Sequence, residues 1–368
     1  MFKRIDLALL FPILFLSLFG ILMIYNGSSI IAFRDFGDKF HYFKEQLTWM
    51  IVGYSFLILF SFLDYHILYK LALPILIVAI IILFGVFIPG LGVYALGAHR
   101  WINLQLFVLQ PAEFVKLSLA IYLSAWFSHK EKERFLAFCL LIGLVLLLIM
   151  LQPDMGTASV ILFEALIVYF LSGGSIKQFT LILPIIIAAG SLLVFIAPYR
   201  MSRVVAFLNT GKSLDSTSYH VKQILIALGS GGIFGVGLGN SLQKYEYLPE
   251  NVTDSIFAII AEEIGFIGSA ILISVFFIVL WRGLIISTKA KDTFGKLLAG
   301  TIISFLGIQI VINLAAMTAL IPLTGIPLPF ISYGGSALIV DLTAIGILLN
   351  IAKQGTIFKQ SAKGIRHR

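Results

Sequence analysis

The sequence predicts an all-α fold, that of a polytopic integral membrane protein with ten transmembrane helices. Hydrophobic residues make up 60% of the 368 residues and charged residues only 12%, whereas charged residues make up about 25% of an ordinary soluble domain. The mean hydropathy is +1.03. The apolar residues come in runs of about 20, the length with which a helix crosses a hydrocarbon core about 30 Å thick. Because lipid offers the backbone no hydrogen-bond partners, each run is expected to form a helix.

Ten such runs follow one another along the chain. They cover residues 7–26, 46–63, 69–89, 111–127, 135–151, 155–172, 179–197, 255–281, 297–321 and 331–352. The first run follows a short basic stretch, as in a signal peptide, but it is too long for one, so we expect it to be retained as the first transmembrane helix. An even number of spans places both termini on the same side of the membrane.

The net charge of +8 arises mainly from Lys and Arg residues in the short connections between these runs. This distribution indicates membrane topology and not DNA recognition, so we expect no nucleic-acid partner. Most of the Lys and Arg residues fall on the side that holds the termini, and the positive-inside rule therefore predicts that both termini are cytoplasmic. Residues 1–354 form the predicted transmembrane domain, and residues 355–368 form a basic cytoplasmic tail.

The longest connection, residues 198–254, joins the seventh and eighth spans, and the predicted topology makes it a large extracytoplasmic loop. Within it, residues 219–241 are too apolar for a solvated loop, and their uninterrupted part before Gly229 is too short to cross a membrane. We therefore expect a short interfacial or re-entrant helix followed by a glycine-rich turn.

Two ionisable residues lie within the fourth span, in the segment QPAEFVK (110–116). Glu113 and Lys116 are three residues apart on one helix face, so they can form an internal ion pair that fixes helix packing. Alternatively, they line a cavity in which the lysine meets an anionic head group. Just before them, GAHRWI (97–102) places Arg100 at the outer interface, where an arginine beside a tryptophan is also typical of a simple membrane anchor.

The segment LQPDMGT (151–157) is expected to form a tight outer turn between two spans. It contains Gln152 and Asp154, and Asp154 lies where an aspartate commonly caps the following helix. The segment IPLTGIPLPFISYGGSA (321–337) combines three prolines with three glycines and no charge, which indicates a rigid, broken re-entry that shapes one rim of an outer cavity. Ser332 and Tyr333 belong to it.

The segment LPENVTD (248–254) places Glu250 and Asp254 at the mouth of the eighth span. An aspartate at this point is commonly only an N-cap, and the helix macrodipole favours its ionised form, which can accept a proton. Glu262 and Glu263 continue an acidic stripe along the same helix, which suits either a transport pathway or pairing with arginines. No Walker A motif, HExxH pair or complete GxGxxG occurs, so ATP-driven transport by this chain alone is not expected.

Taken together, GAHRWI, QPAEFVKL, QPDMGT, the long segment from GSGGIFGVGLGNS to IAEEIGFIG, and TGIPLPFISYGGSA resemble the SEDS family (shape, elongation, division and sporulation). The resemblance covers nearly the whole chain, and GNSLQKYEYLPE (239–250) is closer to the division branch of the family than to its elongation branch. Two departures stand out. The family usually has an aromatic residue where this chain has Ser255, and it has YQ, then QS, where this chain has Tyr219, His220, Gln223 and Ile224. Neither departure removes an acid or base from the signature, so we expect activity to survive.

This resemblance implies a peptidoglycan glycosyltransferase that polymerises lipid II at the outer face of the bacterial cytoplasmic membrane during septal cell-wall synthesis. The implied partners are lipid II itself, a class B penicillin-binding protein transpeptidase and other membrane proteins of the division complex. The family's catalytic aspartate, in its LPE-x-x-TD signature, corresponds to Asp254. Two alternatives remain open: a lipid II flippase, and a non-catalytic scaffold for division proteins.

The implied reaction needs a base for the attacking hydroxyl and a positive charge for the departing pyrophosphate. Asp254 is the expected base, and inversion at the anomeric carbon requires no second carboxylate as nucleophile. The candidates for the pyrophosphate are Arg100, Lys116, Arg203 and Lys244, or a divalent cation such as Mg²⁺ or Mn²⁺. No cofactor or metal ligand set is assigned. The other expected substrate-binding residues are Glu113, Gln152, Asp154, Glu250, Ser332 and Tyr333.

Overall fold

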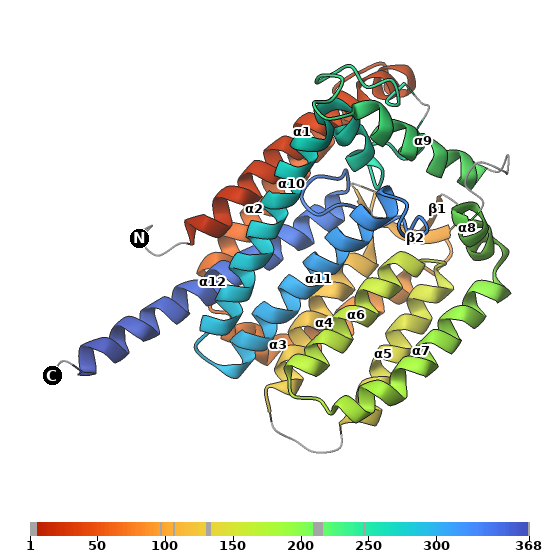
Figure 1. Cartoon of the computed structure of the whole chain (residues 1–368). Helices are drawn as coiled ribbons and strands as arrows, with labels where there is room; N and C mark the ends of the chain where they lie inside the picture. The colour runs from red at the N-terminus through yellow and green to blue at the C-terminus, as the bar shows by residue number, and fades with distance from the viewer. Residues whose placement is uncertain are drawn as a thin grey trace.

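The computed structural model of the chain describes residues 6–366 except 96–97, 106, 130–133, 209–215 and 246–247. These residues form twelve helices and three short strands (Figure 1). In order, the elements are α1 (Leu7–Phe36), α2 (His41–Phe62), α3 (His66–Gly85), β1 (Gly92–Ala95), β2 (Ala98–Asn103), β3 (Val108–Leu109), α4 (Pro111–Phe127), α5 (Phe135–Leu151), α6 (Met155–Leu171), α7 (Ile176–Ile196), α8 (Pro198–Leu208), α9 (Ser216–Gly231), α10 (Ile256–Lys289), α11 (Thr293–Met317) and α12 (Gly335–Arg366).

Each of the ten predicted spans overlaps a helix, namely α1 to α7 and α10 to α12. Among the described residues, seven helices are long and apolar enough to cross a membrane: α1, α2, α3, α7, α10, α11 and the first part of α12, Gly335–Gly355. The helices α5 and α6 are apolar but shorter. A mostly helical chain with several helices of membrane-spanning length is therefore confirmed, whereas the count of ten spans stays a prediction.

The prediction of a purely α-helical chain is incomplete, because β1, β2 and β3 form a small antiparallel sheet between α3 and α4. Val93 pairs with Trp101, and Ile102 pairs with both Gly92 and Leu109. Valine, tryptophan and isoleucine suit a pleated, half-buried surface. The segment is too short for a periodic strand signal, and its arginine and tryptophan favoured the interpretation as a membrane anchor.

The helix α10 extends beyond the predicted end at residue 281 and is interrupted at Gly265, whose φ is 68°. The glycine-rich segment after α9 packs against this break. The amides of Val236 and Gly237 donate to the carbonyls of Glu262 and Glu263, each over 3.0 Å. The break therefore frees two carbonyls from the helix, and the neighbouring segment satisfies them.

The long connection contains two helices, α8 and α9, and four glycines with positive φ follow α9: Gly232, Gly235, Gly237 and Gly239. A helix followed by a glycine-rich turn is thus confirmed, whereas its interfacial or re-entrant position stays a prediction and α8 was not expected. The helix α12 begins at Gly335, later than the predicted span, and continues without a break to Arg366. The predicted boundary between residues 354 and 355 is therefore not a break in secondary structure.

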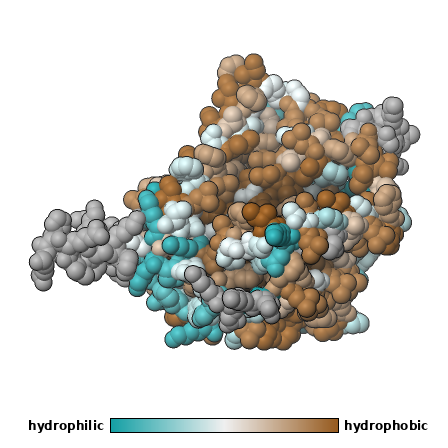
Figure 2. All heavy atoms as spheres, turned by 60° about the horizontal axis from the view of Figure 1, so that its bottom comes forward, coloured by the Kyte–Doolittle hydropathy of each residue, from teal (hydrophilic) through white to brown (hydrophobic). Residues whose placement is uncertain are grey.

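The helices form one bundle, and most of the irregular structure gathers at one end of it (Figure 1). We call this the loop end: it holds the β1–β3 sheet, α8, α9, and the connection between α11 and α12, residues 318–334. The helix α1 begins and α12 ends at the opposite end (Figure 1). Figure 2, turned to bring the lower side of Figure 1 forward, shows hydrophilic residues gathered in one region while apolar residues cover most of the remaining surface.

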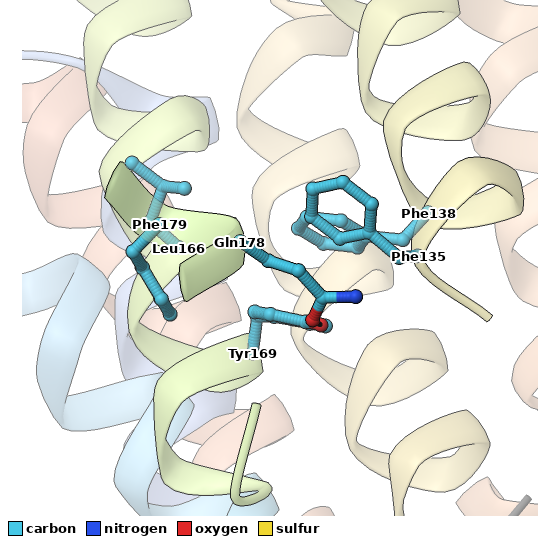
Figure 3. A pocket seen from close by; sticks show the side chains of 6 residues that line it. All are labelled: Phe135, Phe138, Leu166, Tyr169, Gln178 and Phe179. Carbon is cyan, nitrogen blue, oxygen red and sulfur yellow. Dashed lines mark hydrogen bonds between the residues drawn. The ribbon is translucent and has the colours of Figure 1, made fainter. Parts of the chain in front are cut away.

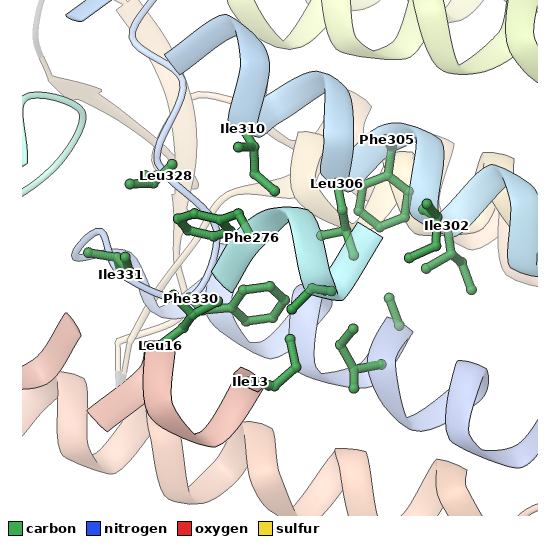
Figure 4. Packing of buried hydrophobic residues seen from close by; sticks show 14 of the residues in the cluster. Ile13, Leu16, Phe276, Ile302, Phe305, Leu306, Ile310, Leu328, Phe330 and Ile331 are labelled. Carbon is green, nitrogen blue, oxygen red and sulfur yellow. The ribbon is translucent and has the colours of Figure 1, made fainter. Parts of the chain in front are cut away.

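Residues 318–334, which we call the α11–α12 segment, are fixed in the core of the bundle. Leu328, Phe330 and Ile331 are almost fully buried and pack among side chains of α1, α10 and α11 (Figure 4). Gly20 of α1 allows this close approach, because a Cβ at that position would lie 2.7 Å from the Cα of Ile331. The prediction of a rigid, non-helical segment is consistent with this packing.

Candidate active site

Asp254 lies at the loop end, two residues before α10 begins, and only 6% of its surface is exposed. It does not cap the helix: the N-cap residue is Ser255, and no side chain makes the capping hydrogen bond. Instead, the Asp254 carboxylate accepts a 3.0 Å hydrogen bond from the hydroxyl of Thr253. The alternative interpretation of Asp254 as an N-cap is therefore wrong.

Burial and the nearby Glu250 carboxyl raise the pKa of Asp254 well above its usual value. This direction opposes the expectation that the helix N-terminus keeps the group ionised, because removing the anion from water favours the protonated form. The Glu250 carboxyl lies close enough to Asp254 for its charge to disfavour ionisation of Asp254. Like charges at this distance repel, which favours retention of a proton on Asp254.

Glu250 also shapes the turn that leads into α10. Its φ is 51°, in the left-handed region, and its carbonyl accepts hydrogen bonds of 3.2 Å from the amides of Thr253 and Ser255. These contacts agree with the interpretation of Glu250 as a residue that orders the loop. The turn therefore fixes both carboxyl groups on one short stretch of backbone.

The α11–α12 segment covers Asp254. Gly325, with a φ of 74°, lies so close that a Cβ placed there would be 3.8 Å from the Asp254 Oδ2. On the neighbouring helix, the side-chain amide of Asn313 donates to the carbonyl of Asp254 over 2.9 Å and to that of Ile326 over 2.8 Å. Asn313 was not among the residues predicted from the sequence, although an amide within an apolar span is costly and usually has a partner.

Two residues of the long connection, Arg203 and His220, complete the set of residues around Asp254, which we call the Asp254 group. Arg203 of α8 is half-buried and donates a 3.0 Å hydrogen bond to the carbonyl of Leu323. His220 of α9 lies with its Nε2 2.8 Å from the Oγ of Ser255. Burial lowers the pKa of His220, while Glu250 raises it and Arg203 lowers it further; the net lowering of the pKa favours the neutral imidazole. The two departures from the family pattern, at positions 220 and 255, are thus in contact.

Arg100, Gln152 and Asp154 form a second unit at the loop end. The Arg100 guanidinium donates to the carbonyls of Gln152, over 3.2 Å, and Pro153, over 2.5 Å. Asp154 accepts from the amide and hydroxyl of Thr157, over 3.0 and 2.8 Å, so its predicted role as an N-cap is confirmed. All three residues therefore stabilise the turn between α5 and α6.

This turn adjoins the α11–α12 segment. A Cβ at Gly156, in the first turn of α6, would lie 2.6 Å from the carbonyl oxygen of Thr324. Thr324 precedes Gly325, which faces Asp254. The Arg100 unit and the Asp254 group therefore contact neighbouring residues of the same segment.

Glu113 and Lys116 form the predicted ion pair, with 2.7 Å between Oε2 and Nζ and with both side chains 1% exposed. Glu164 and Asp341 also interact electrostatically with Lys116, and both are equally buried. One ammonium group thus faces three carboxyl groups in the interior. To reach a substrate, Lys116 would have to leave its partner Glu113.

Lys244 is held in a separate network and is 5% exposed. Its ammonium donates to the Asn26 side chain over 3.0 Å and to the carbonyl of Gly239, and it lies 3.7 Å from Glu263. Glu262 accepts from Ser230, Ser241 and the amide of Leu242. The acidic stripe of α10 therefore anchors the glycine-rich segment, and its described partners include no arginine.

Ser332 and Tyr333 fasten the far end of the α11–α12 segment. The Ser332 hydroxyl accepts a 2.8 Å hydrogen bond from the amide of Leu328. The Tyr333 amide donates to the carbonyl of Val252 over 2.8 Å, and its hydroxyl donates to Glu45 of α2. Through Val252, Tyr333 is linked to the turn that carries Asp254.

The part of the chain that the structure describes contains no group of three or more His, Cys, Asp or Glu side chains that could hold a metal ion. A small hollow lies between α5, α6 and α7, where α5 and α7 begin and α6 ends (Figure 3). Aromatic and aliphatic side chains line it, and its Tyr169 hydroxyl already bonds to Gln178. This hollow offers no reactive group, so the Asp254 group is the best candidate for an active site.

The chain is similar in sequence to a known family. The profile of the family described as "Cell cycle protein", which covers FtsW, RodA and SpoVE, matches residues 7–357. The chain is 38% identical over 354 residues to stage V sporulation protein E of Bacillus subtilis (strain 168), with coverage of 95% of this chain and 97% of the relative. It is 39% identical over 357 residues to "Probable peptidoglycan glycosyltransferase FtsW" of Trichlorobacter lovleyi, with coverage of 94% and 93%.

The fold is similar to that of two solved structures. The rod shape determining protein RodA of Thermus thermophilus matches with a TM-score of 0.69 and 25% identity, over 96% of this chain and 98% of that one. A chain from the structure described as "Structural coordination of polymerization and crosslinking by a peptidoglycan synthase complex" matches with a TM-score of 0.78 and 26% identity, over 96% and 99%.

Proposed function

This chain belongs to the cell cycle protein family of FtsW, RodA and SpoVE, and we propose on that premise that it is a peptidoglycan glycosyltransferase that polymerises lipid II. The observation that carries this proposal is the buried carboxyl of Asp254 beside the exposed carboxyl of Glu250 at the loop end, with Arg203 close by. A base and a cation are the two groups that transfer of a glycosyl group from a pyrophosphate requires.

The carboxyl pair supplies the base. In its ionised form, Asp254 accepts the proton of the attacking 4-hydroxyl as the new glycosidic bond forms. The raised pKa of Asp254 suits this task, because a base works best when its pKa is near the operating pH. Attack and departure of the lipid pyrophosphate occur in one step, which inverts the anomeric carbon.

Arg203 is the strongest candidate for the group that meets the pyrophosphate. Its guanidinium interacts with His220, which also interacts with Glu250, and one of its nitrogens bonds to the segment that covers Asp254. Arg100 bonds to two carbonyls, and Lys116 and Lys244 are almost fully buried beside carboxylates. They contribute to substrate binding only if those contacts open, and a divalent cation is the alternative source of positive charge.

The Asp254 carboxyl is closed off, since it is 6% exposed and lies against the α11–α12 segment, although Glu250 and Gly325 beside it are exposed. Entry of a lipid-linked sugar therefore requires movement at the loop end. We further propose ten spans with both termini in the cytoplasm, so that the loop end faces outward, and a role in septal synthesis. The similarity to a chain of a peptidoglycan synthase complex supports a class B penicillin-binding transpeptidase as partner.

The test is polymerisation of purified lipid II by this chain in detergent, with and without the partner transpeptidase. Asp254→Asn should insert and fold normally yet lose glycan synthesis by about 10²- to 10⁴-fold, the contribution of a general base. Asp35→Asn, which changes an exposed carboxylate at the end of α1 in the same way, is the matched control. Near-normal polymer from Asp254→Asn would falsify the assignment of the base.

The buried charges around Lys116 also suit a flippase, because ionisable groups inside membrane proteins often line transport paths. The detergent assay separates the two functions. Polymer made where no bilayer has to be crossed supports the enzyme, whereas lipid II transport by reconstituted protein without any polymer supports the flippase. A scaffold would leave Asp254→Asn fully active in cell division.

A further inference from the structure

The hydrogen bond between His220 and Ser255 joins α9 to the residue that directly follows Asp254. The two atoms are 2.8 Å apart, Ser255 is completely buried and His220 is half-buried. Ser255 occupies the N-cap position of α10, where a serine hydroxyl usually accepts from the first helical amides. No such bond forms here. The hydroxyl is turned toward the imidazole instead.

Ser255 is also tied to the carboxyl pair through its backbone. Its amide donates to the carbonyl of Glu250 over 3.2 Å, and the peptide unit on its N-terminal side carries the Asp254 carbonyl that Asn313 holds. The bond from His220 therefore acts on the same few atoms that set the direction of the Asp254 side chain. A substitution at position 220 should therefore affect the orientation of Asp254 through one intervening residue, Ser255.

The helix α9, which carries His220, is held firmly in the bundle. Val221, Ile224 and Ala227 are buried in the same core as the first turns of α10. At the end of α9, a Cβ on Gly231 would lie 2.2 Å from the carbonyl oxygen of Ala261, so the two backbones touch. Packing between α9 and α10 thus sets the position of His220 relative to Ser255.

We propose that His220 is a positioning residue for the reaction: by holding the Ser255 hydroxyl, it fixes the Asp254 carboxyl in the direction from which it takes the proton of the acceptor sugar. This inference rests on the proposed function. His220 does not touch substrate in this role. It affects the rate of the chemical step, because a small displacement of a catalytic group lowers the turnover rate far more than it weakens substrate binding.

The central test compares His220→Leu with His220→Gln. Leucine fills a similar volume but cannot bond to Ser255, so kcat should fall about tenfold, which corresponds to about 1.4 kcal/mol and to the loss of one hydrogen bond. KM for lipid II and the thermal midpoint should stay nearly unchanged. Glutamine has an amide that reaches the Ser255 hydroxyl, so His220→Gln should restore most of kcat. Tyr219→Phe, on the exposed neighbouring residue of α9, is the control.

A double-mutant cycle isolates the contact. Ser255→Ala should lower kcat by the same factor as His220→Leu, and the double variant should be no worse than either single variant, since both remove one interaction. Losses that multiply in the double variant, an unchanged kcat in His220→Leu, or an effect confined to KM would each overturn the proposal. A fall in kcat that merely follows a lower thermal midpoint would overturn it as well.

The outcome is separable from that of the proposed function. If wild-type protein makes polymer and Asp254→Asn does not, while the His220 variants are normal, only the positioning role fails. If Asp254→Asn retains activity, the assignment of the base fails, whatever the His220 variants do.

Discussion

The side-chain amide of Asn313 donates a 2.9 Å hydrogen bond to the main-chain carbonyl of Asp254. The same nitrogen donates over 2.8 Å to the carbonyl of Ile326. One residue of α11 thus holds the turn that carries the candidate base and the segment that covers it. Because Asn313 is 1% exposed, no water replaces these bonds easily.

Asn313→Leu should destabilise the protein and impair glycan synthesis together. The substitution keeps the approximate volume but leaves two buried carbonyls without a donor, at a cost of about 1–3 kcal/mol for each group. Thermal unfolding in detergent and lipid II polymerisation are the measurements.

The matched control for this prediction is Asn350→Leu. It removes another buried amide, which donates a 3.0 Å hydrogen bond to the carbonyl of Ser61 away from the loop end. This variant should lower the thermal midpoint without a comparable loss of activity in the protein that remains folded. If Asn313→Leu has wild-type activity, Asn313 does not hold the site.

The sequence was most informative where structure depends on neighbouring residues. Runs of apolar residues predicted the long helices, and the three-residue spacing of Glu113 and Lys116 predicted their ion pair. Asp154 as a helix cap was predictable for the same reason. The errors concern contacts between distant segments, whose partners are decided only when the bundle packs.

Arg100 and Asp254 illustrate these errors. Arg100 bonds to a turn 52 residues away, and no local pattern predicts that partner. For Asp254, the helix N-terminus favours the ionised carboxylate, but burial beside residues 318–334 and the proximity of Glu250 shift its pKa in the opposite direction. Burial depends on a segment that follows much later in the chain, so local sequence could not reveal it.

Glu250→Gln should shift the acid limb of the pH–activity profile to lower pH. The Glu250 carboxyl contributes to the raised pKa of Asp254, second to burial, so its neutral replacement should lower that pKa. Asp254 would then remain able to accept a proton in more acidic solution. The measurement is kcat/KM for lipid II as a function of pH, from mildly acidic to mildly alkaline solution. A shift to higher pH contradicts the carboxyl pair.

Asp254→Asn should stabilise the folded protein, and more so at alkaline pH. Because the pKa of Asp254 is higher in the folded than in the unfolded chain, its carboxyl favours folding at low pH, and this contribution is lost as pH rises through the folded pKa. Asparagine never ionises, so the difference in thermal midpoint between variant and wild type should grow with pH. Asp35→Asn serves again as control. An equal difference at acidic and alkaline pH would mean that Asp254 does not titrate.

The buried pair of Glu113 and Lys116 should behave as a structural unit. Lys116→Met removes the only ammonium facing Glu113, Glu164 and Asp341 among the described residues, and breaking a buried ion pair by removing one partner typically costs about 3–5 kcal/mol. Adding Glu113→Gln should recover part of the loss. Thermal midpoints of the single and double variants measure this coupling. If Lys116→Met instead keeps its stability and weakens only the use of lipid II, Lys116 belongs to the substrate site.

Substitutions of Arg203 and Arg100 should have different effects, the first mainly on substrate binding and the second mainly on stability. Arg203→Gln removes a positive charge that acts beside Glu250 and His220, so lipid II should bind less tightly and KM should rise, with little change in the thermal midpoint. Arg100→Gln should instead lower the thermal midpoint, because Arg100 holds the carbonyls of Gln152 and Pro153 at the turn before α6. The substrate-binding role expected for Arg100 predicts a higher KM there too. If KM is unchanged in Arg203→Gln but raised in Arg100→Gln, the pyrophosphate meets the Arg100 side of the α11–α12 segment, and the ranking of the two arginines is reversed.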